Sequence, residues 1–183
     1  MRTDRWSGAG SSTNPCDETY RGAAAGDSPE NKGLLAQINA LAAGKGVQLY
    51  IDVHSYSQLF MTRNTPHNTH ILNNLLTNIS AYGYSCSAKP QNNSVLQSLA
   101  AGVAAAIRAV YGTAFQYGPV CNTIYQVAGG SIDYVQDVTK AKYVFTVELR
   151  DTGTNGFVLP ASQILPSGVE TYAGFRHLLV NMV

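Results

Sequence analysis

The sequence predicts an α/β protein in which a mixed β-sheet is flanked by helices. Two mostly apolar runs, VQLYIDV (47–53) and YVFTVEL (143–149), have the length and the β-branched content of buried strands. Three other segments are predicted to be helices, and two of them repeat apolar residues at helical spacing. Helices that alternate with buried strands are typical of folds whose ligand sites lie beyond the carboxyl ends of the strands.

The composition indicates one globular domain and excludes several classes of partner. The 183 residues carry a formal net charge of +1, and 45% of them are hydrophobic whereas only 13% are charged. Such a chain can bury a sizeable core, so it is not disordered. Without a basic block, we expect neither nucleic acid nor a membrane surface as partner. No run of 18 apolar residues predicts a membrane span, and the first ten residues lack a signal-peptide pattern.

The first predicted helix follows an irregular segment. Residues 1–27 are rich in Gly, Ala, Ser and Pro and show no periodicity, which predicts irregular structure. Ser28 is the expected N-cap, Pro29 occupies the first helical position and Glu30 places an acid in the first turn. The apolar residues that follow at helical spacing are Leu34, Leu35, Ile38 and Leu41. Gly44 then ends the predicted helix.

Two further helices are predicted later in the chain. The segment 96–111 is rich in small residues and is closed by Gly112. Its expected buried face consists of Leu96, Leu99, Val103, Ile107 and Val110. The small residues predict close packing against a neighbour. A final helix is predicted from about Ser167 to Asn181.

Polar side chains stand at the ends of both predicted strands. His54 follows the first strand, and a histidine there is more often a hydrogen-bonded structural residue than a metal ligand. Glu148 stands near the end of the second strand, where a carboxylate is costly to bury unless a partner such as Arg150 neutralises it. The alternative is that Glu148 is a general base beside a metal-bound water. Tyr125 precedes two glycines, so it is either a surface tyrosine or part of a segment that moves.

Three segments taken together carry a more specific signal: IDVHSYSQLF (51–60), TIYQVAGGSIDY (123–134) and FTVELRDTGTNGFVLPASQILP (145–166). With NPCDETYRG, SPENKG and AVYGTAFQYG, they resemble the carboxypeptidase A family of zinc metallocarboxypeptidases, especially its secreted fungal members. The resemblance covers roughly the C-terminal 60% of that family's catalytic domain. It implies a carboxypeptidase-like fold, an extracellular location, and release of apolar aliphatic or aromatic C-terminal residues from peptides.

The resemblance also implies a role for individual residues. His54 matches the family's third zinc ligand, and Glu148 matches the glutamate that activates the zinc-bound water. Ser55 and Tyr56 match residues that line the cleft, and Tyr125 matches the tyrosine that closes over the substrate's C-terminal residue. The residues that correspond to an apolar specificity pocket are Val120, Ile124, Val127, Ile132 and Thr146. Burial of an apolar substrate side chain would supply the binding free energy there.

Departures from the family pattern lie near the start of the chain. The family's other two zinc ligands form a His-x-x-Glu motif upstream of HSYSQ, and no histidine of this sequence has a glutamate three residues later. A catalytic zinc needs about three protein ligands. Arg5 stands near the position of an Asn-Arg pair that grips the substrate's terminal carboxylate, so Arg5 is a further candidate. We therefore expect residues 1–183 to be an N-terminally truncated, partial catalytic domain.

Residues 63–81 have no counterpart in the family and are predicted to be an inserted loop, either a genuine surface loop or a retained intron. The resemblance pairs Cys86 with Cys121 in a disulfide and leaves Cys16 without a partner. The expected form is a monomer that acts on peptide or protein C-termini. Two alternatives remain open: a catalytically dead domain that still binds peptide C-termini, and a fragment without function.

Overall fold

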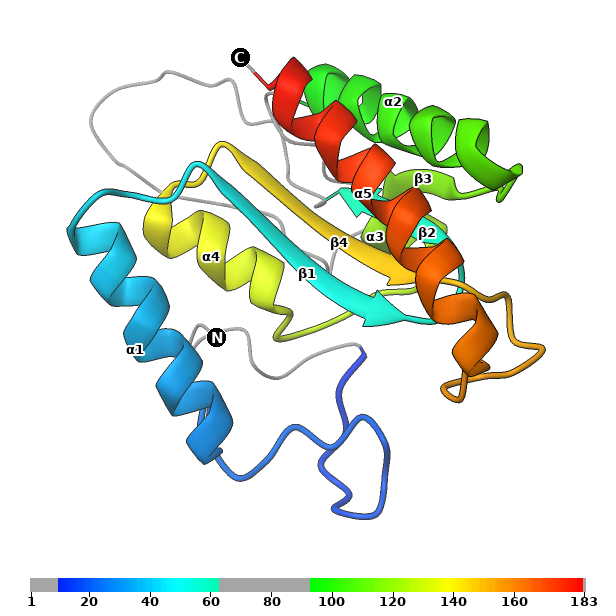
Figure 1. The fold of residues 1–183 in the computed structure, drawn as a ribbon. Coiled ribbons are helices and arrows are strands. Elements are labelled where there is room, and N and C mark those ends of the chain that lie inside the picture. Colours follow the sequence, from blue (N-terminus) through cyan, green and yellow to red (C-terminus); the bar gives the residue numbers. More distant parts are fainter. Residues whose placement is uncertain (1–9, 63–92, 183) are drawn as a thin grey trace. The chain divides into compact units, whose positions relative to one another are not determined.

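The computed structural model describes residues 10–62 and 93–182 (Figure 1). The chain divides into two compact units. The described residues of the first unit are 10–50 and 120–144, and those of the second are 51–62, 93–119 and 145–182. The expectations for Arg5, Cys86 and the inserted loop 63–81 fall outside the described residues.

In the first unit, an irregular segment leads into α1 (Pro29–Ala43), as predicted. Residues 10–28 form turns and one isolated bridge between Ser12 and Tyr20. The Ser28 hydroxyl oxygen accepts a hydrogen bond from the Asn31 N–H at 3.2 Å, which confirms the predicted N-cap. The helix ends at Gly44, again as predicted.

The apolar face predicted for α1 is only partly buried. Ile38 is buried, whereas Leu34 and Leu41 are each 45% exposed. Helix α1 packs against α4 (Ser131–Thr139), and the Tyr134 hydroxyl donates to Asn39 Oδ1 at 2.9 Å. The contact between α1 and α4 is therefore partly polar.

Helix α4 and the short α3 (Val120–Thr123) were not expected from the sequence. The N-cap of α4 is Gly130, which has no side chain with which to cap the helix. A helix of nine residues without a capping side chain lacks the usual sequence signals for a helix start. Tertiary packing around its buried Ile132 and Val135 therefore decides that α4 forms.

The sheet is mixed and has four strands in the order β1-β4-β2-β3. Most of the sheet belongs to the second unit, which includes its first strand from Ile51 and its last strand from Phe145. The strands are β1 (Leu49–Ser55), β2 (Leu59–Thr62), β3 (Gln116–Pro119) and β4 (Tyr143–Leu149). Strand β2 runs parallel to β3 and antiparallel to β4, with Leu59 opposite Glu148. Figure 1 shows β1 and β4 side by side along most of their length. The predicted mixed sheet flanked by helices is confirmed.

The two predicted strands differ in burial. Strand β4 is buried as expected, with Val144, Phe145 and Val147 inaccessible to solvent. The expectation that the first strand is buried is wrong, because β1 is half-buried at its start and exposed at its end, where Val53 is 50% exposed. An apolar run does not distinguish a central strand from an edge strand, and β1 is an edge strand of the described sheet. The fully buried β2 was missed because it has only four residues.

Two helices cover the sheet of the second unit. Helix α2 (Asn93–Tyr111) packs against β2, β3 and α5 (Ile164–Asn181), which follows a 3-10 turn and begins three residues before the predicted start. The predicted face of α2 is buried at Leu96, Leu99, Val103 and Ile107, and Val110 is half-buried. By length and composition α2 could cross a membrane, but its apolar face forms part of the core.

The expected close packing of α2 is confirmed at its contact with α5. A Cβ atom on Gly174 would lie 2.8 Å from Ile107 Cγ1, and one on Gly102 would lie 2.1 Å from His177 Nε2. Each glycine therefore allows a side chain of the other helix to approach its backbone. The two helices pack at a distance that larger residues at these positions would prevent.

Candidate functional site

His54 and Glu148 lie on neighbouring strands of the second unit, β1 and β4. His54 Nε2 lies 3.0 Å from Asp52 Oδ1, and the side chains of these residues are 51% and 27% exposed. Alternate residues of a strand point to the same face, so this contact follows from the spacing of the two residues. The Thr146 hydroxyl donates to the Asp52 carbonyl oxygen at 3.2 Å and links β4 to β1 beside the histidine.

Glu148 is half-buried, and burial raises the pKa of its carboxyl above the ordinary value. The nearby His54 lowers this pKa, whereas the negative charge of Asp52 raises it. His54, Asp52 and Glu148 therefore interact electrostatically. A carboxyl whose pKa is raised by desolvation accepts a proton more readily than an ordinary carboxyl does, which suits a general base.

The interpretation that Arg150 neutralises Glu148 is wrong. Arg150 Nε donates to Glu170 Oε1 at 2.7 Å, and Nη2 donates to the second oxygen of the same carboxylate. Nη2 also donates to Thr113 Oγ1 at 2.9 Å. Glu170 lies on α5 and is fully buried, so it is the stronger competitor for the guanidinium. Arg150 is therefore engaged by Glu170 and not by Glu148.

Ser55 is exposed at the end of β1, and Tyr56 follows it. The Tyr56 ring meets the Phe157 ring edge to face, with centroids 5.1 Å apart. Phe157 is 81% exposed, and its loop is held by Asp151, which accepts hydrogen bonds from the backbone N–H groups of Gly153 and Asn155. The half-buried Tyr56 and the exposed Phe157 thus form an aromatic contact in the unit that holds His54 and Glu148.

Sequence reasoning missed two residues of this site, Asp52 and Phe157. Both lie inside the segments that carry the family resemblance, but neither was given a role. The signal for Asp52 was available, since an acid two residues before a histidine on a strand shares its face. Phe157 offered no such signal, because the loop turns between Asp151 and Phe157 determine its contact with Tyr56.

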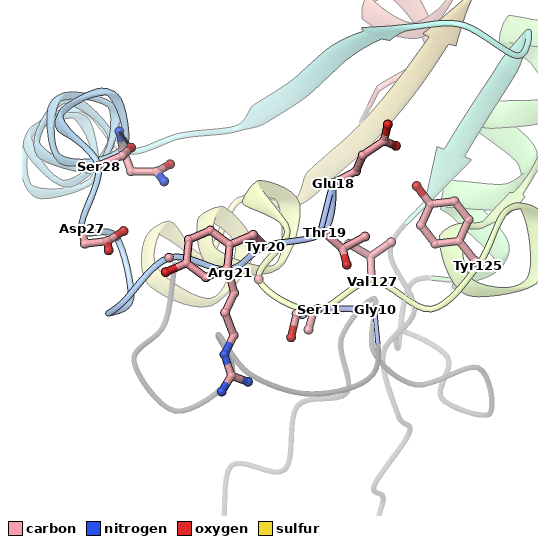
Figure 2. Close-up of a pocket in the computed structure, with 15 residues that line it drawn as sticks. Gly10, Ser11, Glu18, Thr19, Tyr20, Arg21, Asp27, Ser28, Tyr125 and Val127 are labelled. Carbon is pink, nitrogen blue, oxygen red and sulfur yellow. Dashed lines mark hydrogen bonds between the residues drawn. The ribbon is translucent and has the colours of Figure 1, made fainter. Parts of the chain in front are cut away.

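Tyr125 lies in the first unit, where it lines a cavity of about 430 Å³. The cavity is built from two stretches of chain, residues 10–31 and 125–129. Figure 2 shows the side chains of Tyr125 and Glu18 extending toward the top of the view and that of Arg21, which also lines the cavity, extending toward the bottom. The two stretches approach each other closely at Gly10. A Cβ atom on this residue would lie 2.1 Å from the Gln126 carbonyl oxygen.

The residues predicted to form an apolar pocket differ in their surroundings. Ile132 and Val120 are buried, and Ile124 and Val127 are half-buried. Of these four residues of the first unit, Val127 lines the cavity beside Tyr125. Thr146 belongs to the second unit, where its hydroxyl is bonded to Asp52.

The cysteines are described only in part. Cys16 is an exposed free thiol, as expected, and Cys121 is buried. Cys86, the expected partner of Cys121, lies outside the described residues. The pairing of Cys86 with Cys121 therefore stays a prediction.

The surroundings of His54 fit a metal ligand, but the part of the chain that the structure describes holds no complete ligand set. Its Nε2 faces a carboxylate, as the second nitrogen of a metal-binding histidine commonly does, which leaves Nδ1 for a metal ion. Within residues 10–62 and 93–182, no group of three or more His, Cys, Asp or Glu side chains comes together as a metal site. Within the described residues, His54 therefore stays a candidate ligand without partners that would complete a metal site.

The comparisons with known proteins agree on one family. The family model for zinc carboxypeptidases matches residues 3–174. Metallocarboxypeptidase A of Trichophyton rubrum is 49% identical over 170 residues, which cover 93% of this chain and 36% of that protein. Carboxypeptidase A2 of Mus musculus is 39% identical over 172 residues, covering 94% of this chain and 36% of that protein. The chain thus spans about a third of the length of these relatives.

Solved structures show the same relationship. Bovine thrombin-activatable fibrinolysis inhibitor, solved in complex with tick carboxypeptidase inhibitor, matches with a TM-score of 0.80 and 28% identity over 98% of this chain and 55% of that chain. Carboxypeptidase A from Helicoverpa armigera, at 23% identity, shows the same fold with a TM-score of 0.75 over 94% of this chain and 38% of that chain. The chain therefore belongs to the zinc carboxypeptidase family.

Proposed function

We propose that this chain supplies part of the active site of a metallocarboxypeptidase that releases apolar C-terminal residues from peptides. The observation that carries the proposal is the placement of His54 and Glu148 on the neighbouring strands β1 and β4. The pKa of Glu148 is raised by burial, and Arg150 is engaged by Glu170 instead. A desolvated carboxylate that Arg150 does not neutralise is suited to remove a proton from water.

In this proposal His54 binds zinc through Nδ1 while Nε2 faces Asp52. A bound zinc ion would act as a Lewis acid on the substrate carbonyl and on water. A Glu148 carboxylate oxygen accepts a proton from the attacking water and then delivers it to the amine of the leaving residue. Ser55 and Tyr56 contact the peptide beside the scissile bond.

The substrate class follows from the residues that match the family's specificity pocket. Ile132 carries no charge, so a Lys or Arg side chain would be desolvated there without a counterion. The Thr146 hydroxyl is already bonded to the Asp52 carbonyl, which leaves its methyl group for an apolar ligand. Tyr125 closes over the substrate's C-terminal residue, and Arg5 contacts its carboxylate. The other pocket residues in this proposal are Val120, Ile124 and Val127.

Other parts of the proposal concern the context of the reaction. The family's His-x-x-Glu motif is missing from the sequence, so we expect residues 1–183 by themselves to be an incomplete, inactive form. The protein acts outside the cell as a monomer on peptide or protein C-termini, with a disulfide between Cys86 and Cys121. Nucleic acid and membranes are not among the proposed partners.

A chimera tests the proposed activity. The upstream part of the Trichophyton rubrum metallocarboxypeptidase A is joined before Trp6, and residues 63–81 are deleted. We expect hydrolysis of substrates that end in Phe or Leu, and much slower hydrolysis of those that end in Lys or Arg. The change Glu148→Gln should nearly abolish turnover while zinc stays bound, because it removes the base and no ligand.

The matched control in the chimera is Glu30→Gln, which removes an exposed carboxylate from the first turn of α1. It should leave turnover close to that of the parent. If the Glu148→Gln chimera keeps most of its activity, the role proposed for Glu148 is wrong. If the chimera prefers substrates that end in Lys, the role proposed for Ile132 is wrong, whereas the role of Glu148 is unaffected.

A second candidate function is binding of peptide C-termini without hydrolysis. It is favoured by the cavity beside Tyr125, which exists in a unit that supplies neither His54 nor Glu148. Calorimetric titration of residues 1–183 with a peptide ending in Phe tests it, with the C-terminally amidated peptide as control. Binding of the free acid alone, without cleavage, supports this candidate. Equal or absent binding of both peptides contradicts it.

A further inference from the structure

Asp52 connects His54 with the neighbouring strand β4. Its carboxylate Oδ1 lies 3.0 Å from His54 Nε2, and its backbone carbonyl oxygen accepts a hydrogen bond from Thr146 Oγ1 at 3.2 Å. Because Asp52 and His54 are two residues apart on β1, their side chains share one face of the sheet. The backbone of Asp52 is thus fixed to β4 while its carboxylate faces the imidazole.

Among the described residues, His54 pairs with the side chain of Asp52. Its side chain is 51% exposed, and it lies in the exposed last part of β1, an edge strand of the described sheet. An exposed side chain with few packed neighbours populates several rotamers, and restricting it to one costs conformational entropy. A rotation of the ring by 180° would also exchange the positions of its carbon and nitrogen atoms. A specific contact is needed to select one orientation.

We propose that Asp52 is a positioning residue for His54, because its carboxylate holds Nε2 and leaves Nδ1 as the nitrogen that binds a metal ion. The inference rests on the proposed function for the identity of that metal as zinc, and on the structure for the orientation of the ring. Histidines that bind metals usually pair their second ring nitrogen with a carboxylate or a carbonyl, and loss of that partner typically lowers metal affinity by about 10-fold to 100-fold.

The geometry also assigns a smaller, indirect part to Thr146. Its hydroxyl donates to the residue that holds the imidazole, so it restrains the separation of β1 and β4 at this point. Replacing Thr146 by Val keeps the shape of the side chain and removes the donor. If Asp52 positions His54, Thr146→Val should also make the orientation of the His54 ring less uniform. The effect should be smaller than that of losing the Asp52 carboxylate.

The experiment is nitrogen NMR of the imidazole rings in residues 1–183, without added metal and at a pH where the histidines are neutral. The signals of His54 are assigned by their loss in His54→Gln. In the parent we expect one form with the proton on Nε2 and a visible Nε2–H signal. Asp52→Ala should give a mixture of the two neutral forms, with the Nε2–H signal lost to exchange with water. Asp52→Asn, which keeps an acceptor oxygen, should restore the parent pattern.

Glu30→Ala is the charge-matched control, since it removes one exposed carboxylate and should leave the His54 signals unchanged. The proposal is wrong if the parent carries its proton on Nδ1, or if Asp52→Ala leaves the His54 signals as they were. The parent spectrum shows which ring nitrogen of His54 carries the proton, even if Asp52→Ala does not fold. The measurement requires neither zinc nor turnover, so an inactive chimera with a correctly oriented His54 would count against the proposed function and not against this inference.

Discussion

Arg150 and Glu170 form a buried ion pair that joins the residue after β4 to helix α5. Arg150 Nε donates to Glu170 Oε1 at 2.7 Å, and the Glu170 side chain has no exposed surface. Thr113 Oγ1 donates to the same carboxylate at 2.6 Å. Both oxygens of Glu170 therefore have partners, which is the condition under which a charge can be buried in a protein. The pair also engages Arg150, the arginine nearest to Glu148 in the sequence, away from that carboxylate.

Removal of Glu170 should destabilise the protein strongly. Glu170→Ala leaves the largely buried guanidinium of Arg150 without its partner, and a broken buried pair typically costs about 3–5 kcal/mol. Glu170→Gln keeps the shape and one acceptor oxygen, so it should cost less. Urea unfolding of both variants and of Glu30→Ala as control measures the difference. A loss below about 1 kcal/mol for Glu170→Ala would show that the pair is not important for stability.

Glu148→Gln should stabilise the fold at neutral pH. Burial raises the pKa of Glu148 in the folded state, so the folded state binds a proton more tightly than the unfolded state does. The stability that this proton contributes is fully present below the unfolded pKa of about 4.5 and is lost as pH rises through the folded pKa. Glu148→Gln should therefore be more stable than the parent at pH values above the folded pKa of Glu148. This difference in stability should disappear at pH values below the unfolded pKa.

Unfolding curves collected across this pH range check the prediction for Glu148. Glu30→Gln is the contrasting control, because it removes a favourable acid from the first turn of α1 and should destabilise the protein slightly at neutral pH. A Glu148→Gln variant that is less stable than the parent at neutral pH would mean that the carboxylate is better solvated than the structure indicates.

Asp151 should hold the loop that carries Phe157. Its carboxylate accepts hydrogen bonds from Gly153 and Asn155, and the Gly153 N–H is the main cause that lowers the pKa of Asp151. Stability from a lowered carboxyl pKa is present above the unfolded value of 3.8 and is lost as pH falls through the folded pKa. Asp151→Ala should speed hydrogen exchange at the Gly153 and Asn155 amides. Equal exchange in variant and parent would contradict this prediction.

Two glycines of α5 should respond in opposite directions to the same substitution. A Cβ atom at Gly174 would lie 2.8 Å from Ile107, so Gly174→Ala should destabilise by about 1–3 kcal/mol through overpacking. Gly168 has open space around its Cα, so Gly168→Ala should stabilise by up to about 1 kcal/mol through helix propensity. Chemical denaturation of both variants measures the two effects. If both variants gain stability or both lose it, the close contact between α2 and α5 is refuted.

The sequence determined the elements whose signals are local. Ser28 and Pro29 specify the start of α1 through a cap and a fixed φ angle, and the structure confirms both. The apolar periodicity of segment 96–111 specified α2 and its buried face, because a helix brings residues three and four apart onto one side. The continuous run of segment 143–149 specified β4 as a buried strand. The family motifs pointed to His54 and Glu148 for the same reason, since each is contained in a short contiguous segment.

The tertiary structure decided which residues meet across the chain. Arg150 is two residues from Glu148 in sequence, yet it pairs with Glu170, because α5 brings a fully buried carboxylate to it. Strand β1 reads as a buried strand but is exposed at its end, because its burial depends on neighbouring strands and not on its own residues. The link from Thr146 to Asp52 joins residues 94 positions apart. Such contacts depend on strand order and register, which local sequence signals do not encode.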